Sequence, residues 1–207
     1  MFGLFRKDPK IKGEIAYFEL QDWWLTAFTQ EERDHIEEVF QPLGTEPNSK
    51  PLTQGDINYS SDTAAGLLDA LAGWFNNPKD REIIDKAEEL APSGEDILNH
   101  HFTLQQKMEI YYRERETSPD GMEKAIKACR DQIALAPEAA KAFLKEYPEQ
   151  PLPAHAGYSQ LRIILEKQDK FDEAIELYEQ ADKQGWAGNW DKQIETLKKK
   201  KEKAAKS

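Results

Sequence analysis

The segment YSQLRIILEKQDKFDEAIELYEQADKQGW, from Tyr158 to Trp186, decides the fold class of this chain. In its second half the apolar residues recur at steps of three and four, the spacing of one helix face, at Phe171, Ala174, Ile175, Tyr178 and Ala181. The first half has the same spacing at Tyr158, Leu161, Ile164 and Leu165. Only the short polar stretch KQDK separates the halves, so the segment predicts an antiparallel helical hairpin.

Helical spacing also dominates the rest of the chain, which predicts an all-α protein. Thr29 and Glu32 have the spacing of a capping box and predict a helix start before RDHIEEVF. Further helix starts are predicted at Asn77 with Pro78, Ser93 with Asp96, Ser118 with Pro119, and Pro137. The stretch from Gln41 to Ser61 is rich in Pro, Gly, Asn and Ser and predicts a long surface loop. The segment PEQPLPAHAG, residues 148–157, predicts a second connector.

The composition limits the classes of function open to this chain. Its 207 residues suffice for one ordinary domain, with 39% apolar and 32% charged residues. No apolar run reaches the roughly 18 residues of a membrane-spanning helix. The start MFGLFRKDPKIKGE lacks the features of a secretory signal. Its single cysteine, Cys129, cannot form an internal disulfide, so we expect a cytoplasmic protein.

Charge is distributed unevenly along the chain. Residues 1–99 hold 9 Lys and Arg against 20 Asp and Glu, whereas residues 100–207 hold 19 of each kind. The acidic front half argues against nucleic-acid binding, which requires basic surface. The C-terminal lysines of KKKKEKAAK suit the negative end of a helix dipole, although they could also contact an acidic surface.

The stretch from His155 to Gly188 resembles a tetratricopeptide repeat, a 34-residue unit of two helices. The matching positions are Tyr158 and Leu161 on the first helix, and Phe171, Ala174, Tyr178 and Ala181 on the second. Arg162 and Asp169 stand where that family usually has a small residue and a turn glycine, and Trp186 stands near its usual proline. The resemblance implies closely packed helix pairs that require stacked neighbours.

A weaker copy of the repeat lies upstream, in LQQKMEIYYRER and GMEKAIKACRDQIALAP. Its matching positions are Met122, Ala125, Cys129 and Pro137, while Gln132 replaces the second alanine. The resemblance covers residues 100–190. Residues 191–207 are predicted to form a capping helix and basic tail, with Trp190, Ile194 and Leu197 covering the last repeat. Residues 1–99 resemble no family, and are predicted to pack on the array as an N-terminal helical region. The pattern of charged helical hairpins beside short repeats also resembles that of uncharacterised bacterial proteins, and this resemblance gives no activity to transfer to the chain.

The sequence offers little for catalysis, and we predict neither a cofactor nor a metal site. His100 and His101 are adjacent, so on a helix they point about 100° apart and do not chelate one ion well. We expect one to be partly buried and the other to lie at the surface. His35 and His155 are isolated, and no neighbour in the sequence gives either one a role. Cys129 occupies a packing position of the weaker repeat.

Protein or peptide binding is therefore the function that the sequence favours, in a groove lined by the first helix of each pair. By resemblance, the groove residues are Tyr112, Arg113, Arg115, Ser159, Ile163, Glu166 and Lys167. The Lys and Asn pair with which some repeats of this family clamp a C-terminal carboxylate does not match at Ser159 and Ile163. Two alternatives stay open: a structural subunit of a larger assembly, and an enzyme with a site near the loop at 41–61, where NYSSDT gathers polar residues.

Overall fold

The computed structural model describes residues 10–76, 78–91 and 96–206, and these contain ten α-helices and no strand. The helices are α1 (Gly13–Tyr17), α2 (Gln21–Ala27), α3 (Gln30–Val39), α4 (Ala64–Ala72), α5 (Lys79–Leu90), α6 (Ile97–Arg113), α7 (Gly121–Glu146), α8 (Ala156–Lys167), α9 (Phe171–Lys183) and α10 (Trp190–Ala204). The predicted all-α class is confirmed. The helix-start residues Asn77 and Ser93 lie outside the described residues. No described helix has the length and apolar character needed to cross a membrane.

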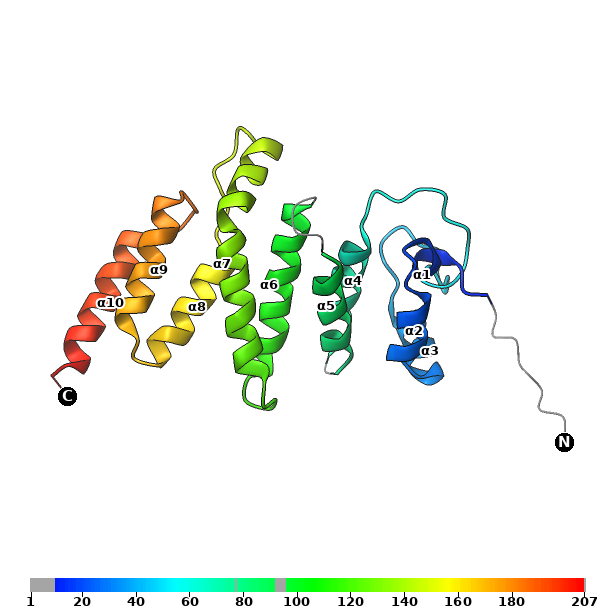
Figure 1. The fold of residues 1–207 in the computed structure, drawn as a ribbon, viewed down its shortest axis with the longest axis horizontal. Helices are drawn as coiled ribbons and strands as arrows, with labels where there is room; N and C mark the ends of the chain where they lie inside the picture. Colours follow the sequence, from blue (N-terminus) through cyan, green and yellow to red (C-terminus); the bar gives the residue numbers. More distant parts are fainter. Residues whose placement is uncertain (1–9, 77, 92–95, 207) are drawn as a thin grey trace.

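The helices lie in a row and pack as successive pairs, with α1 to α3 at one end of the molecule and α10 at the other (Figure 1). The pairs are α4 with α5, α6 with α7, and α8 with α9, and α10 packs on α9. Helices α4 and α6 also touch directly, as do α6 and α8, so these three line a common side of the row. This arrangement is compatible with a helical repeat, and α4–α5 adds a pair that has no visible repeat signature in the sequence.

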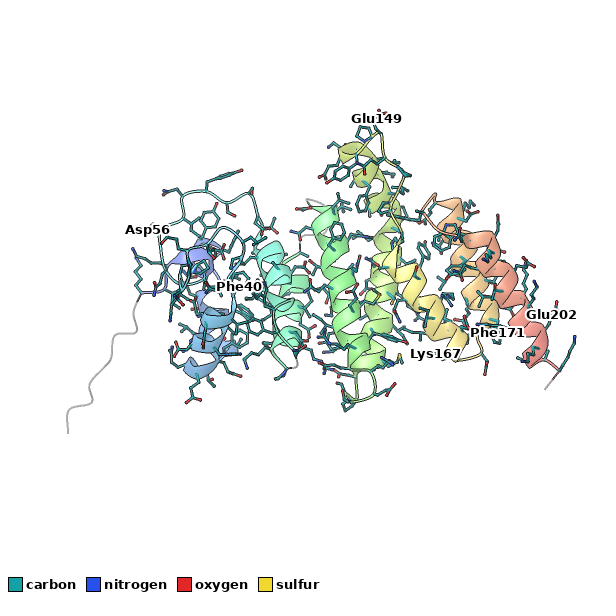
Figure 2. The ribbon with its side chains drawn as sticks, turned by 180° about the vertical axis from the view of Figure 1, so that it is seen from behind. Phe40, Asp56, Glu149, Lys167, Phe171 and Glu202 are labelled. Atoms are coloured by element: carbon teal, nitrogen blue, oxygen red, sulfur yellow. The ribbon has the colours of Figure 1, made fainter. Side chains whose placement is uncertain are left out.

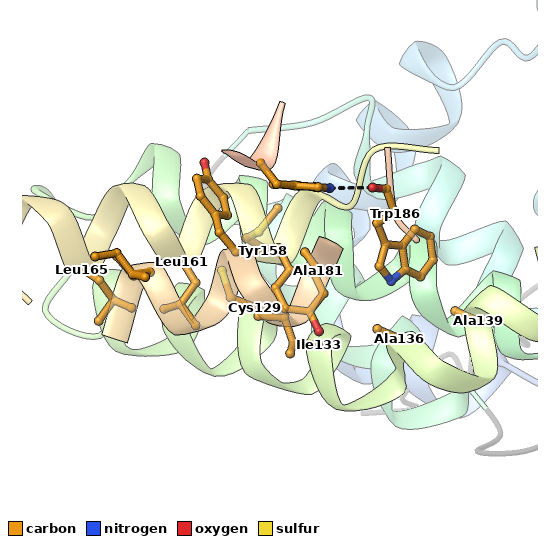
Figure 3. Close-up of a cluster of buried hydrophobic side chains, with 14 of the residues drawn as sticks. Cys129, Ile133, Ala136, Ala139, Tyr158, Leu161, Leu165, Ala181 and Trp186 are labelled. Atoms are coloured by element: carbon orange, nitrogen blue, oxygen red, sulfur yellow. Dashed lines mark hydrogen bonds between the residues drawn. The ribbon is translucent and has the colours of Figure 1, made fainter. Parts of the chain in front are cut away.

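The hairpin of α8 and α9 is built as the sequence spacing predicts. Tyr158, Leu161, Ala174 and Ala181 are buried in one core cluster, and the two alanines have no exposed surface (Figure 3). Arg162 reaches across the pair to α9, where its Nε atom donates to the Tyr178 hydroxyl at 2.7 Å, and its Nη1 atom pairs with Glu166 at 2.7 Å. The helix pair thus tolerates this large side chain because its charged end is satisfied by a hydrogen bond and an ion pair.

The turn between α8 and α9 explains the second departure from the repeat pattern. Asp169 has a φ of 57°, in the left-handed region where glycine is favoured. Aspartate is one of the few other residues that visit this region at modest cost. The backbone conformation typical of a glycine is therefore kept although the residue differs.

Helix α10 covers the end of the row, as predicted. Trp190 and Leu197 are buried, and Ile194 packs against the same cluster. The Trp190 Nε1 atom donates to the Trp186 carbonyl oxygen at 2.6 Å, which fixes the start of α10 on the preceding loop. The lysines of α10 lie on its exposed side.

Helix α7 contradicts the prediction that Pro137 opens a separate short helix. The helix runs without a break from Gly121 to Glu146, with Pro137 inside it. A proline in a helix interior removes one backbone hydrogen bond. Ala136 and Ala139 on either side of it are fully buried, whereas Pro137 itself is exposed. Packing of the alanine face therefore outweighs the lost bond, and α7 projects beyond its neighbours (Figure 1), with Glu149 at the outer end (Figure 2).

The segment from Gln41 to Ser61 is a loop, but it does not lie wholly on the surface as predicted. Leu52 has no exposed surface, and the carbonyl oxygens of residues 51–55 accept the backbone N–H groups of residues 12–15 at 2.9–3.0 Å. These N–H groups belong to the first turn of α1, where backbone donors have no acceptor within the helix itself. Gly13 permits this contact because its φ is +59° and a Cβ atom there would overlap the Pro51 carbonyl oxygen.

The core consists of two clusters of buried apolar side chains. One gathers residues of α1–α5 and the 41–61 loop with Ile110, Tyr111 and Ala125. The other extends from α6 to α10. Both clusters draw on α6 and α7, so this pair joins the N-terminal helices to the rest of the row.

Candidate functional site

The common side of α4, α6 and α8 contains a hollow of about 520 Å³ between α4 and α6, here called the α4–α6 hollow. It is lined by Asp69, Ala72, Gly73, Phe75, Phe102, Gln105, Gln106, Glu109, Ile110 and Arg113. Helix α6 supplies its lining from positions spaced by three and four residues, which place these side chains on one face. The hollow therefore combines apolar, amide and acidic groups on two rigid helices.

Asp69 gives the α4–α6 hollow its acidic character. Its side chain is half-buried, and its Oδ1 atom is buried without a hydrogen-bond partner. Burial, followed by the charges of Asp62 and Glu109, raises the pKa of Asp69 to about 6. A cation placed in the hollow would relieve both the missing hydrogen bond and the repulsion among the carboxylates.

One exposed aromatic side chain lines the α4–α6 hollow. Phe102 is 47% exposed and meets the ring of Phe143 edge-on at 5.9 Å. This ring is thus held by a second aromatic side chain while much of it stays exposed, as in the aromatic anchors of binding surfaces. Trp74 is 44% exposed and packs on Phe40 at 5.6 Å, but it does not line the hollow.

Arg113, one of the predicted groove residues, lies at the edge of the hollow but is already engaged. Its Nη2 atom lies 2.5 Å from Oδ2 of Asp80, whose side chain is fully buried. Burial raises the pKa of Asp80 despite the arginine. Arg113 therefore compensates a buried carboxylate, in addition to any contact with a partner.

Three other predicted groove residues meet between the C-terminal ends of α6 and α8. The Arg115 guanidinium lies 4.3 Å from the centre of the Tyr112 ring, and the Lys167 Nζ atom lies 3.3 Å from the Tyr112 hydroxyl. Lys167 stands at the exposed end of α8 (Figure 2). These contacts form a basic edge on the same side of the row as the acidic hollow.

The remaining predicted residues lie along α8. Ser159 and Ile163 are half-buried. Glu166 forms ion pairs with Arg162 at 2.7 Å and with Lys200 of α10. Burial raises the pKa of Glu166, but the bonds to Lys200 and Arg162 outweigh it, so the pKa is lowered overall. The structure thus distributes the seven residues along α6 and α8, and their role in binding stays a prediction.

The histidines differ from the sequence-based expectation. His101 is buried and His100 is half-buried, so neither is a freely exposed surface residue. His155, for which the sequence gives no role, caps α8 by accepting the Tyr158 backbone N–H on Nδ1 at 3.4 Å. Gln132 of α7 links α6 to α8, since it donates to the His101 carbonyl oxygen at 3.0 Å and accepts from the Gly157 N–H at 2.7 Å.

His101 and His155 form a buried pair, with ring centres 5.0 Å apart and Trp186 packed on both. Burial lowers the pKa of His101 to about 4, with a further contribution from the charge of His100, and lowers the pKa of His155 to about 3, with a further contribution from the charge of His101. Both rings are therefore neutral near pH 7. Their place in the core gives them a structural role in the junction of α6, α7 and α8.

Other candidate chemical groups are used by the fold. Cys129 is fully buried, and burial raises the pKa of its thiol to about 12, in agreement with a packing role. In the polar cluster NYSSDT, Thr63 caps α4 by accepting the Gly66 N–H at 3.0 Å. In the described part of the chain, no group of three or more His, Cys, Asp or Glu side chains is arranged to hold a metal ion.

No family model matches this chain, and neither a curated protein nor a solved structure is similar to it at a significant level. The site must therefore be interpreted from its own geometry. Neither Asp69 nor Phe102 is among the residues that the sequence predicts to bind a partner. A signal for Asp69 was present, since it is the sole charged residue in the apolar run AAGLLDALA.

Proposed function

We propose that this protein is a tetratricopeptide-like adaptor, which binds a segment of a partner protein on the side formed by α4, α6 and α8. The observation that carries the proposal is the α4–α6 hollow, where the half-buried Asp69, whose Oδ1 atom has no hydrogen-bond partner, shares the lining with the exposed ring of Phe102. Such a combination costs stability in isolation and is relieved by a complementary ligand.

The chemistry of the hollow indicates what the partner segment carries. A lysine or arginine would pair with Asp69 and Glu109, and a neighbouring large apolar residue would pack on Phe102. The amide side chains of Gln105 and Gln106 supply both donors and acceptors for the backbone of a bound segment. An acidic hollow in a chain of net charge −11 does not favour a nucleic acid. The single cysteine supports a cytoplasmic location for the proposed adaptor.

A display library of short random peptides, selected on the immobilised protein, tests this proposal. We expect enrichment of sequences in which a basic residue stands near a large apolar one. Phe102→Ser and Asp69→Asn should each weaken a selected peptide by about tenfold, the equivalent of roughly 1.4 kcal/mol.

Matched controls separate the hollow from general surface effects. Leu144→Ser removes an equally exposed apolar side chain on α7, and Glu176→Gln removes an exposed carboxylate on α9. Both should leave peptide affinity unchanged, with far-UV circular dichroism confirming equal helicity. A failure to enrich any sequence, or equal losses in the control variants, would contradict the proposal.

A further inference from the structure

A second cavity, of about 280 Å³, lies in the N-terminal region and shares no residue with the α4–α6 hollow. It is here called the Glu37 cavity. Its lining comes from α2, α3, residues 10–12 and the docked loop, and comprises Lys10, Ile11, Lys12, Trp24, Leu25, Gln30, Arg33, Asp34, Glu37, Lys50, Thr53, Gln54 and Gly55. The backbone hydrogen bonds between residues 12–15 and 51–55 hold one wall of it in place.

Glu37 is the buried polar group of this cavity, with only 4% of its surface exposed. Thr53 Oγ1 donates to one carboxyl oxygen, but the other, Oε2, is buried without a partner. A buried acceptor left unsatisfied costs about 1–3 kcal/mol. A ligand that brings an N–H group to Oε2 would recover this cost.

The charged groups that line the cavity are mostly positive, with Lys10, Lys12, Arg33 and Lys50 against Asp34 and Glu37. Arg33 donates to the carbonyl oxygen of Phe28 and to Gln30, and Lys12 pairs with Asp56 at 3.0 Å. Burial raises the pKa of Glu37, and the Thr53 hydrogen bond and the charge of Lys50 partly oppose that rise, so Lys50 lies near this carboxyl group. Lys10 forms no ion pair within the described residues, and the excess of positive groups favours an anionic group on a ligand.

Apolar side chains line the same cavity. Trp24 is 1% exposed and Ile11 is half-buried, whereas Leu25 is 43% exposed. The volume of about 280 Å³ lies just below the range for small-molecule sites, which begins at roughly 300 Å³. The site thus has room for one small apolar body beside its charged groups.

We propose that the Glu37 cavity binds a small organic carboxylate that has an apolar body and an N–H donor, as in an N-acylated amino acid. The N–H group meets Glu37 Oε2, the carboxylate meets Lys50 and Lys10, and the apolar part lies against Trp24 and Leu25. A bare inorganic anion does not suit the site because it would meet the Glu37 carboxyl group without a donor. A simple amine does not suit it because the lysines of the lining would repel it.

The indole N–H signal of Trp24 in a ¹H–¹⁵N correlation spectrum reports directly on this cavity, and Trp24→Phe assigns it. The probe is N-acetyl-L-leucine, which carries all three features. N-acetyl-L-leucinamide lacks the carboxylate, and 4-methylpentanoate lacks the N–H donor. We expect a saturable shift with N-acetyl-L-leucine in the millimolar range, and binding weaker by about tenfold for each of the other two, the loss of one charge-assisted contact.

Two substitutions test the polar ends of the cavity. Lys50→Gln removes one positive charge, and Glu37→Gln keeps an oxygen for Thr53 while changing the group that faces the ligand. Each should weaken N-acetyl-L-leucine by about tenfold, whereas Lys192→Gln on α10 should not. The spectrum itself shows whether each variant is folded. The proposal is overturned by the absence of a saturable shift, by equal binding of all three compounds, or by binding that Lys50→Gln leaves unchanged.

Discussion

The helices at the two ends of the molecule are stabilised in different ways. Helices α6 to α10 have 12–26 residues and bury long apolar faces against one another. Helices α1 to α3 have only 5–10 residues, too short to be stable alone. Their buried side chains share a core cluster with α4 and α5, and α1 is also held by backbone hydrogen bonds from the 51–55 segment. Long helix faces thus stabilise one end of the molecule, whereas the short helices at the other end depend on loop docking in addition to side-chain packing.

The strongest test of this difference is Gly13→Ala, which attacks the loop contact. A left-handed alanine costs about 1–2 kcal/mol, and overlap of its Cβ atom with the Pro51 carbonyl oxygen forces the loop to move. We expect a total loss above about 3 kcal/mol in urea unfolding, with amide exchange rising first in α1–α3.

Gly44→Ala is the matched control for this test. Gly44 also has a positive φ, of +91°, but nothing lies within 4 Å of an added Cβ atom. This variant should lose only about 1–2 kcal/mol of folding free energy, which is the cost of holding an alanine in the left-handed conformation. Equal losses in the two variants would show that the docked loop does not hold α1 in place.

The second test concerns the buried histidine pair at the packed end. The pKa values of His101 and His155 are lowered from an ordinary 6.5 to about 4 and about 3, so below pH 6.5 the unfolded state binds more protons than the folded state. Stability from each histidine is complete above pH 6.5 and falls as the pH falls toward the folded values. Each contributes a loss of about 2 kcal/mol between pH 6.5 and pH 5.

His155→Asn isolates this effect, because asparagine is also a good helix cap. Acidic groups with raised pKa values, such as Asp69, oppose the trend in both proteins and cancel in the comparison. Between pH 7 and pH 5 the parent protein should lose about 2 kcal/mol more than the variant. Parallel pH profiles would rule out neutral burial of His155.

The third test returns to the N-terminal end, at the capping box of α3. The Thr29 side chain accepts the Glu32 backbone N–H, and the Glu32 carboxylate accepts the Thr29 backbone N–H at 2.9 Å. Thr29→Ala should cost about 1 kcal/mol in thermal unfolding, and Thr29→Ser should cost much less because serine retains the acceptor. A similar loss in both variants would assign the effect to something other than the cap.

The smallest expected effect has the opposite sign. Asp169→Gly in the α8–α9 turn should stabilise the protein by up to about 1 kcal/mol, because glycine adopts the left-handed backbone without strain. Asp182→Gly, within α9, should instead cost about 0.3 kcal/mol, the difference between the helix propensities of the two residues. Destabilisation by Asp169→Gly would show that the aspartate side chain stabilises this turn.

The regular part of the row is where sequence patterns performed best. The spacing of apolar residues predicts α8, α9 and the buried face of α10, and the residue types at Thr29 and Glu32 predict the start of α3. These features depend on neighbours three or four positions away, which the sequence displays directly. The prediction failed at Pro137, where the local preference of proline to begin a helix was overridden by the burial of Ala136 and Ala139 against other helices.

The candidate sites were much harder to anticipate, because each joins residues that are far apart in the chain. The acidic hollow combines Asp69 with Glu109, and the histidine pair combines residues 101 and 155. In the sequence Glu37 is one of several carboxylates on a charged helix, and only the folded loop places Thr53 in contact with it. The predicted groove residues Tyr112, Arg115 and Lys167 do meet, whereas Arg113 and Glu166 are engaged by buried or neighbouring charges.

The sequence by itself determined that this protein is all-α, that α8 and α9 form a hairpin, and that α10 has one apolar face, since these follow from local periodicity; that α10 covers the end of the row was implied by the repeat resemblance. Only the tertiary structure decided that α7 is continuous, that the 51–55 segment docks on α1, and which carboxyl groups are buried without partners. The physical reason is that burial and charge pairing depend on distance in space, and short-range patterns carry no information on which remote groups come together.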